Sequence, residues 1–134
     1  MTKTSGIGAL PGPGLGVQCA DFDDDGWDDV FVANDQQANR LWRNQHDGTF
    51  QDEAVLRGVA VNGLGRVAAN MGTAWGDVDS NGLADLFVTH LDLENHTLWK
   101  HEPAGLFMDR TAAAGLAQAA RSTGFGTVLA DLES

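Results

Sequence analysis

Short apolar or alternating runs, separated by polar stretches rich in glycine and aspartate, predict strands along most of the chain. Residues 16–20 form the first run, and residues 29–33 follow with the apolar, β-branched composition of a buried strand. Residues 40–44 alternate and are followed by Asp47-Gly48, a hairpin turn signal, and residues 50–53 predict a fourth strand. No long helical period lies between these strands, so the pattern argues against a doubly wound fold.

The same order of elements recurs further along the chain. The acidic segment Asp21–Asp29 recurs as Asp77–Asp85, and each copy continues into an apolar run, 30–33 and 86–89. Further matches follow in order: Leu41-Trp42 with Leu98-Trp99, Phe50 with Phe107, Gly58 with Gly115, and the glycines Gly16, Gly72 and Gly126. Four strands in roughly 55 residues is typical of a propeller blade. The predicted fold class is therefore all-β, with β-propeller-type four-stranded blades, two repeats and the start of a third.

This repeat divides the chain into four parts. We expect a flexible N-terminal lead at residues 1–14 and the first repeat, or blade, at residues 15–70. The second repeat is expected at residues 71–124, and residues 125–134 are expected to form the first strand of a partial third repeat. Short helical turns are predicted after the fourth strand of each full repeat.

The charge of the chain limits its partners. Its 134 residues include 19 acidic and 8 basic ones, a formal net charge of -11. Phosphate groups bind positive surfaces, so we expect no nucleic acid and no membrane insertion, and the charge favours cations instead. The first residues show no signal peptide, so the sequence assigns no compartment. The single cysteine, Cys19, argues against a disulfide framework or a thiolate zinc site within one chain.

Each acidic segment has the residue types and spacing of a calcium-binding loop. With Asp21 or Asp77 as position 1, side-chain oxygens occupy positions 1, 3, 5 and 9, and a glycine occupies position 6. Calcium takes about six to eight oxygen ligands, largely carboxylates and carbonyls, and the carbonyl of position 7 is available as well. The predicted ligands are Asp21, Asp23, Asp25, Trp27 and Asp29 in the first loop, and Asp77, Asp79, Asn81, Leu83 and Asp85 in the second. We therefore expect two Ca²⁺ sites per chain.

The residue types of the loops argue against other metals and against an EF-hand. An EF-hand is excluded, because its twelfth position needs a Glu and here holds Val32 or Val88. The loops lack His and Cys, which argues against zinc and copper, and magnesium prefers fewer protein ligands. The remaining alternative is an acidic solvated turn. Carboxylate repulsion argues against it, because no lysine or arginine lies between residues 4 and 39. Asp24 and Asp28 are expected to point to solvent.

A third acidic stretch begins near the last residue of the chain. Asp131 and Glu133 align with Asp21 and Asp23 of the first loop. The sequence leaves open whether they join a third metal site.

The two loops and the residues around them resemble a known repeat. Asp-x-Asp-x-Asp/Asn-Gly-x-x-Asp followed by Val/Leu-Phe-Val resembles the FG-GAP or VCBS repeat of integrin-α-like β-propellers. The fuller pattern, residues 39–44 followed by Asp47-Gly-Thr-Phe50, is more similar to the repeat of bacterial proteins related to cartilage acidic protein, the ASPIC/UnbV group. The resemblance implies a β-propeller with calcium in the loop joining the first two strands of a blade. It also implies that the carboxylates named above and Asn81 are ligands, in a family that is usually exported.

These observations predict a calcium-binding repeat module that acts as a binding or scaffold unit, with structural calcium and no catalysis. The alternatives are a carbohydrate-binding, lectin-like propeller and a fragment of a larger propeller enzyme. An enzyme needs a convergent acid/base pair outside the metal loops, and the candidates Glu53, Glu94 and Glu102 are scattered. Two blades leave strand edges and sheet faces open, so we expect self-association into a small homo-oligomer. A protein or glycan is the other expected ligand.

Repeat position and spacing give expectations for the tryptophans, the cysteine and the histidines. Trp42 and Trp99 are equivalent and are expected to pack between blades, with sugar stacking as the alternative role. Cys19 aligns with Trp75, which predicts a buried apolar position. The four histidines, His46, His90, His96 and His101, have no zinc spacing and are expected at the surface or at strand edges.

Overall fold

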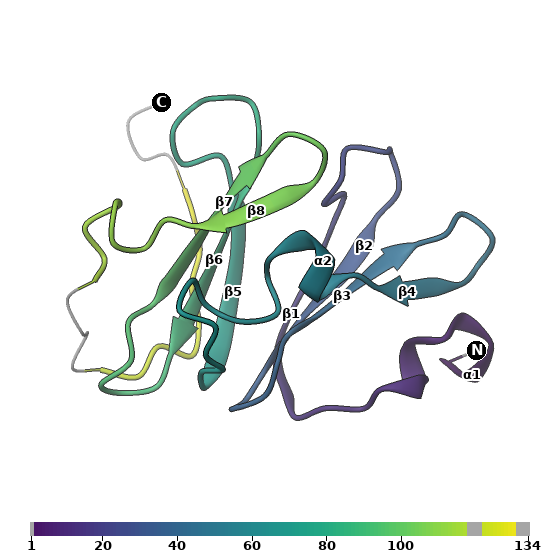
Figure 1. Cartoon of the computed structure of the whole chain (residues 1–134), viewed down its shortest axis with the longest axis horizontal. Coiled ribbons are helices and arrows are strands. Elements are labelled where there is room, and N and C mark those ends of the chain that lie inside the picture. Colours follow the sequence, from purple (N-terminus) through teal and green to yellow (C-terminus); the bar gives the residue numbers. More distant parts are fainter. Residues whose placement is uncertain (1, 118–121, 131–134) are drawn as a thin grey trace.

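The computed structural model describes residues 2–117 and 122–130, and these form two four-stranded antiparallel sheets that lie side by side (Figure 1). The first sheet consists of β1 (Gly14–Ala20), β2 (Asp29–Asn34), β3 (Arg40–Asn44) and β4 (Phe50–Asp52). The second consists of β5 (Asn70–Gly76), β6 (Asp85–His90), β7 (Thr97–Glu102) and β8 (Leu106–Asp109). The short helices are α1 (Thr2–Ser5), η1 (Ile7–Ala9) and α2 (Ala54–Arg57). The predicted all-β class is confirmed.

Each sheet is a meander in which neighbouring strands follow one another along the chain. Every acidic segment joins the first strand of its sheet to the second, so both predicted loops lie at equivalent places. The first strands, β1 and β5, lie against each other, and the hydroxyl of Thr73 donates to the carbonyl of Val17 at 3.1 Å. The helical turn predicted after β4 is α2, while residues 111–115 form a turn after β8.

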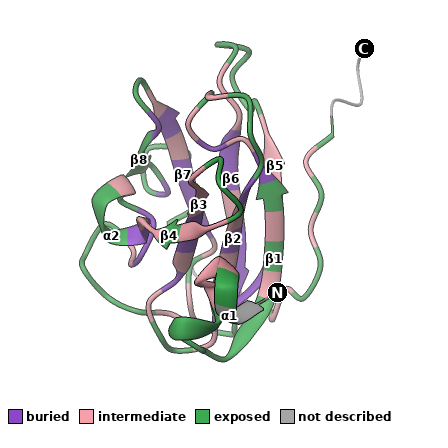
Figure 2. Ribbon diagram, turned by 90° about the vertical axis from the view of Figure 1, so that its right-hand side faces the viewer, coloured by how far each residue is buried: buried purple, intermediate pink, exposed green. Residues whose placement is uncertain are grey.

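Buried apolar side chains of both sheets form one core cluster. In Figure 2 the buried residues gather along the strands. The ring of Phe22, at the start of the first acidic loop, lies 4.4 Å from Trp75 and 6.0 Å from Phe107, centroid to centroid. Trp99 is 1% exposed and belongs to the core cluster between the sheets, as predicted. Trp42 is 4% exposed but lies outside this cluster, since it pairs with Val30 and not with the inward-facing Phe31. Burial of the large side chains of Phe22, Phe107 and Trp99 between the two sheets stabilises their packing.

Buried polar groups close one end of this core. The amide group of Asn70 donates to the Asn34 carbonyl at 2.9 Å, and Asn39 donates to the Val59 carbonyl at 3.1 Å. The backbone N–H of Asn34 donates in turn to the side chain of Asn39. These bonds satisfy polar groups that would otherwise be costly to bury, and they link the first sheet to the linker before β5.

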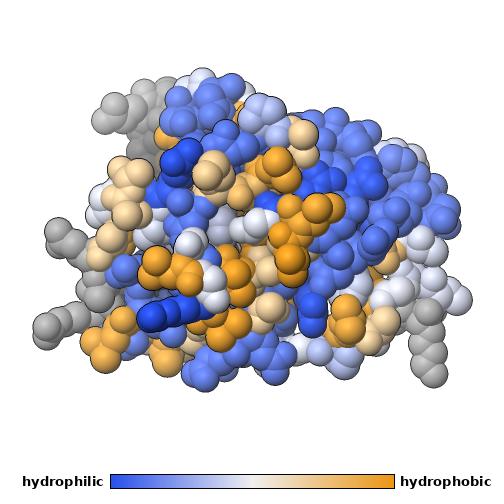
Figure 3. Space-filling model, viewed as in Figure 1, coloured by the Kyte–Doolittle hydropathy of each residue, from blue (hydrophilic) through white to orange (hydrophobic). Residues whose placement is uncertain are grey.

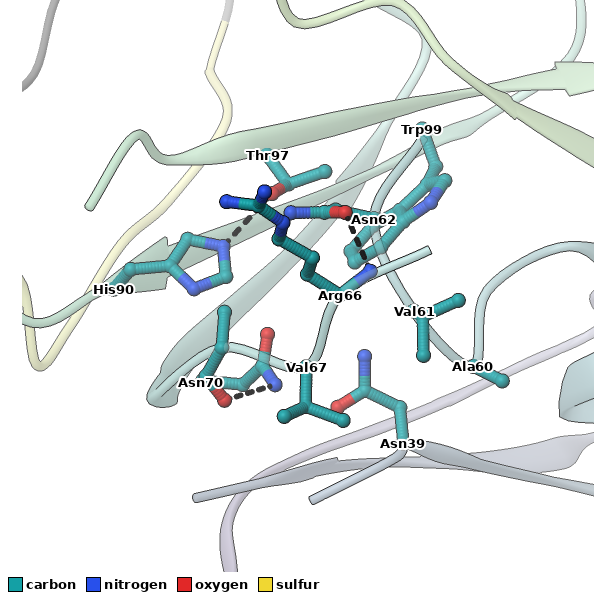
Figure 4. A pocket seen from close by; sticks show the side chains of 11 residues that line it. Asn39, Ala60, Val61, Asn62, Arg66, Val67, Asn70, His90, Thr97 and Trp99 are labelled. Atoms are coloured by element: carbon teal, nitrogen blue, oxygen red, sulfur yellow. Dashed lines mark hydrogen bonds between the residues drawn. The ribbon is translucent and has the colours of Figure 1, made fainter. Parts of the chain in front are cut away.

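The second sheet uses histidines where the first uses asparagines. The N–H of His90 donates to the ring of His96, as that of Asn34 does to Asn39. Figure 4 shows the His90 ring directed toward Thr97, with Nε2 2.9 Å from the hydroxyl oxygen, in a pocket with essentially no free volume. His90 is 1% exposed and His101 is 3% exposed, so the surface prediction was wrong for both. Their packing follows from strand positions that spacing along the chain does not reveal.

The buried His90 predicts a dependence of stability on pH. Burial, with the nearby His96, lowers the pKa of His90 from its ordinary value of 6.5 to about 4. Between these values the unfolded chain binds a proton that the native chain does not, so the free energy of unfolding falls as pH falls. The loss is roughly 2 kcal/mol between pH 7 and pH 5. We expect His90→Asn, which installs the residue of the first repeat, to remove this component.

Urea unfolding of the unmodified protein and of His90→Asn at several pH values measures the contribution of His90 to the free energy of unfolding. The contributions of the carboxylates are common to both proteins and cancel when one free energy is subtracted from the other. Parallel curves of stability against pH for the two proteins would contradict the assignment.

The surface divides by polarity. In Figure 3 the hydrophobic colour gathers over the half of the molecule that holds the second sheet and the loop before it. The half with the first acidic loop and the β3–β4 hairpin is largely hydrophilic.

Cys19 is exposed, so its predicted burial was wrong. No helix in the described part of the chain has the length and apolar content to cross a membrane.

Candidate metal centres

Both acidic loops fold around their first and last aspartates, and the two loops do so in the same way. In the first, Asp21 accepts the N–H groups of positions 5 and 6 at 3.0 and 2.8 Å. Asp29, which is 1% exposed, accepts the N–H groups of Phe22 and Asn44 at 3.1 and 2.8 Å. The loop is therefore closed on itself and tied to β3.

The second loop repeats these contacts at equivalent positions. Asp77 accepts the N–H groups of positions 5 and 6 at 3.2 and 2.7 Å. Asp85, fully buried, accepts the N–H groups of Val78 and His101 at 3.1 and 2.9 Å. The conserved spacing within the repeat thus has a structural cause, because the same carboxylates hold the same backbone turns.

The aspartates of positions 1, 3 and 9 come together in each loop. In both cases one carboxylate oxygen from each lies within 4.8 Å of the others. The groups are Asp21, Asp23 and Asp29, and Asp77, Asp79 and Asp85. Six of the predicted side-chain ligands are therefore clustered.

The position-5 side chains take another role. Asp25 and Asn81 each accept the N–H of the residue two positions on, Trp27 and Leu83, at 3.0 and 2.8 Å. Asp25 lies outside the three-carboxylate cluster of its loop. Asp24 and Asp28 are exposed, as predicted. Asp131 and Glu133, the candidates for a third site, lie outside the described residues.

Basic side chains from distant elements contact the first loop. Asp23 is bonded to Arg43 of β3 and to Arg57 of α2, and Asp25 is bonded to Arg43 and to His46 at 3.0 and 2.8 Å. Carboxylate repulsion without a basic partner, expected from the sequence, is therefore wrong for this loop. Arginines far along the sequence supply the partners, because β3 and α2 both lie against the loop.

The second loop has one corresponding partner. Lys100 of β7 occupies the repeat position of Arg43 and contacts Asp79 and Asp85 at 2.8 and 2.6 Å. The ion pairs offset part of the carboxylate charge in each loop. They also hold the third strand of each sheet to the loop between its first two strands.

The protonation of the carboxylates depends on these contacts. Burial disfavours the charged form of Asp25, but the bond to His46 and further donors outweigh it and lower the pKa of this carboxyl. The N–H of Gly82 is the main cause of the lowered pKa of Asp77. Burial raises the pKa of Asp29, only partly offset by its two N–H donors. A cation bound next to Asp29 would stabilise its charged form.

One oxygen of the first cluster fits a cation directly. Asp23 uses Oδ2 for both arginines, whereas its Oδ1 is buried and has no hydrogen-bond partner. A buried charged oxygen without a partner is costly, and a hard cation satisfies it. The donor set of clustered carboxylates, without nitrogen or sulfur, suits calcium better than zinc or copper.

The scattered glutamates each have a partner of their own. Glu53 and Glu102 pair with arginines at 2.8 and 3.6 Å, and Glu94 accepts a backbone N–H at 2.8 Å. Glu94 also lines a cleft of about 620 Å³ between the loop before β5 and residues 109–117. Among the described residues, each of the three glutamates therefore bonds a different partner, and these contacts bring no two of them together.

The comparisons with known proteins agree with the repeat. A family model described as FG-GAP-like repeat matches residues 21–88, about half of the chain. This range runs from the first acidic loop through the second loop into β6. No curated protein matches the chain.

Proposed function

Because this chain belongs to the FG-GAP-like repeat family, we propose that it is a calcium-stabilised, non-catalytic binding or scaffold module whose two sheets are blades of propeller type. The observation that carries the proposal is the pair of matched carboxylate clusters, one in each repeat. The unpartnered Oδ1 of Asp23 supports cation binding in the first. A bound ion would fix the loop between the first two strands of each sheet and so couple metal binding to folding.

The alternatives have weaker support. A lectin-like site built on Trp42 and Trp99 would need exposed rings for sugar stacking, and both rings are buried. Trp27 is 51% exposed, but its ring stacks on His46 at 5.1 Å. An enzyme fragment would need an acid/base pair, and the candidate glutamates are engaged in separate bonds. The calcium in our proposal is therefore structural.

Calorimetric titration with calcium tests the proposal. We expect two sites per chain in the unmodified protein. Asp23→Asn removes a charged oxygen from the first cluster and should weaken one site by at least about tenfold, leaving the other unchanged.

Asp24→Asn is the matched control, because it makes the same change at an adjacent exposed residue outside the cluster. Equal effects of Asp23→Asn and Asp24→Asn would reduce the loop to a general acidic surface. The absence of measurable calcium binding to the unmodified protein would reject the proposal.

A further inference from the structure

The internal repeat allows each sheet to serve as a reference for the exposure of the other. Phe22, Phe31 and Val59 of the first repeat face the second sheet and are 1%, 0% and 0% exposed. Their equivalents are Val78, which is 45% exposed, Phe87, which is half-buried, and Leu116, which is 37% exposed. We call these three residues the trailing face. It is the surface of the second repeat that corresponds to a buried surface of the first.

A complementary surface lies at the other side of the molecule. Val88 of the second sheet faces the first sheet and is 0% exposed, and Trp75 packs against the core. Their equivalents in the first sheet are half-buried Val32 and exposed Cys19. Val17 of β1 lies beside Val32 in the strand register and is 62% exposed. We call Val17, Cys19 and Val32 the leading face. Cys19 is exposed where its equivalent Trp75 is covered by the first sheet, because no described residue packs on Cys19 in the same way.

The close contact between β1 and β5 is repeated between β5 and residues 124–130. A Cβ on Gly16 would overlap the carbonyl oxygen of Met71 in β5. A Cβ on the equivalent Gly72 would lie 2.7 Å from the carbonyl oxygen of Phe125. Residues 124–130 therefore lie on β5 as β5 lies on β1, and the yellow segment of Figure 1 runs along this flank. Their order Gly-Phe-Gly-Thr-Val-Leu-Ala matches the Gly-Leu-Gly-Val-Gln-Cys-Ala of β1.

The beginning of the chain shows the same relation at the opposite side. Gly58, after α2, has φ 87° and an added Cβ would lie 2.5 Å from the carbonyl oxygen of Phe107. Gly6, after α1, also has φ 87° and its Cβ would lie 2.9 Å from the carbonyl oxygen of Phe50, the equivalent residue. The segment predicted only as a lead therefore packs on the first sheet as α2 packs on the second.

We propose that the trailing face of one copy of this chain docks on the leading face of a second copy, reproducing the contact between the two sheets within the chain. We choose a second copy as the occupant for a reason of repeat equivalence. Its leading face has the repeat positions of Trp75 and Val88, which within one chain already pack against the first sheet. Such a contact is heterologous, so repeated docking produces a ring if its rotation closes and a filament if it does not.

Two segments of the chain already cover part of these faces, so a second copy must displace them to dock. On the copy that offers its trailing face, residues 124–130 lie where β1 of the other copy would lie. On the copy that offers its leading face, residues 2–9 lie where the turn at residues 111–116 of the first copy would lie. Phe125 and Val128 are 74% and 79% exposed, so the C-terminal segment is shallowly seated and open to displacement. The net charge of -11 on each copy opposes association, and salt should therefore promote it.

Mixing of two face variants tests the proposal. Leu116→Asp places a charge on the trailing face and Val17→Asp on the leading face, and neither residue belongs to an acidic loop. In sedimentation velocity at moderate salt over a range of concentrations, we expect the unmodified protein to exceed 14.2 kDa, the mass of one chain. Each variant alone should stay monomeric. An equimolar mixture should form a dimer, because one intact face remains on each partner and the two are complementary.

Val55→Asp is the matched control, since Val55 is 84% exposed and belongs to neither face. It should assemble like the unmodified protein, and near-ultraviolet circular dichroism confirms that each variant is folded. A monomeric unmodified protein at every concentration would overturn the inference, as would a mixture of folded variants that stays monomeric. Assembly of the single variants at the normal level would overturn it too. Running the series with calcium and with chelator separates this result from the proposed metal function, because the two substituted residues, Val17 and Leu116, lie outside both acidic loops.

Discussion

Millimolar calcium is expected to raise the melting temperature of this protein by roughly 15 °C over its value in chelator. A ligand that binds only the native state stabilises it by about 2.7 kcal/mol at a hundred times the dissociation constant, and two sites double this. At a few degrees per kcal/mol for a domain of this size, the sum gives the stated shift. The physical source is the repulsion that remains among three carboxylates within 4.8 Å in each loop after their ion pairs, together with the unpartnered Oδ1 of Asp23 in the first loop. Differential scanning calorimetry measures it.

Two comparisons make the calcium result specific. Magnesium at the same concentration should produce a smaller shift, because it retains its water ligands and makes fewer bonds to a protein loop. The double variant Asp23→Asn, Asp79→Asn removes one clustered carboxylate from each repeat and should lose most of the calcium-dependent gain. An unchanged melting temperature from micromolar to millimolar calcium, with chelator as the zero point, would show that the loops do not bind the ion.

The repeat and its strands could be predicted from the sequence because their signals are local. Alternation and β-branched runs mark β2 and β3, and the glycine at position 6 marks the turn of each loop. The clustering of Asp21, Asp23 and Asp29 follows from the same local geometry, since the first and last of them hold backbone N–H groups of their own loop. The local spacing of a tight loop thus determines which carboxylates meet.

The features that the sequence missed depend on contacts between distant segments. Arg43 and Arg57 reach Asp23 only because β3 and α2 fold against the loop. The burial of His90 depends on its contact with the linker before β5, and the exposure of Cys19 depends on which face of β1 turns toward the second sheet. The role of α1 could have been found by aligning Gly6-Ile7 with Gly58-Val59, a match too short to stand out alone.

The equivalent glycines Gly16, Gly72 and Gly126 predict a second large effect, on the free energy of unfolding, because their surroundings differ. Gly16 lies directly against the carbonyl of Met71, whereas a Cβ on Gly126 would meet nothing within 4 Å among the described residues. Neither glycine has a positive φ, so an alanine at either site is opposed only by its contacts. The two positions therefore separate the effect of strand packing from the general effect of replacing glycine.

Gly16→Ala is expected to lower the free energy of unfolding by about 3 kcal/mol, because its methyl group must push β1 away from β5 and backbone atoms cannot rotate aside as a side chain does. Separation of these strands also loosens the core around Phe22 and Trp75, which depends on the same sheet-to-sheet distance. Gly126→Ala, the same change at the equivalent but open position, should alter stability by no more than about 0.5 kcal/mol. Urea unfolding followed by tryptophan fluorescence measures both variants. Equal losses in the two proteins would show that the contact between β1 and β5 does not govern the stability of the pair, and a neutral Gly16→Ala would show that the two strands are not in contact in solution.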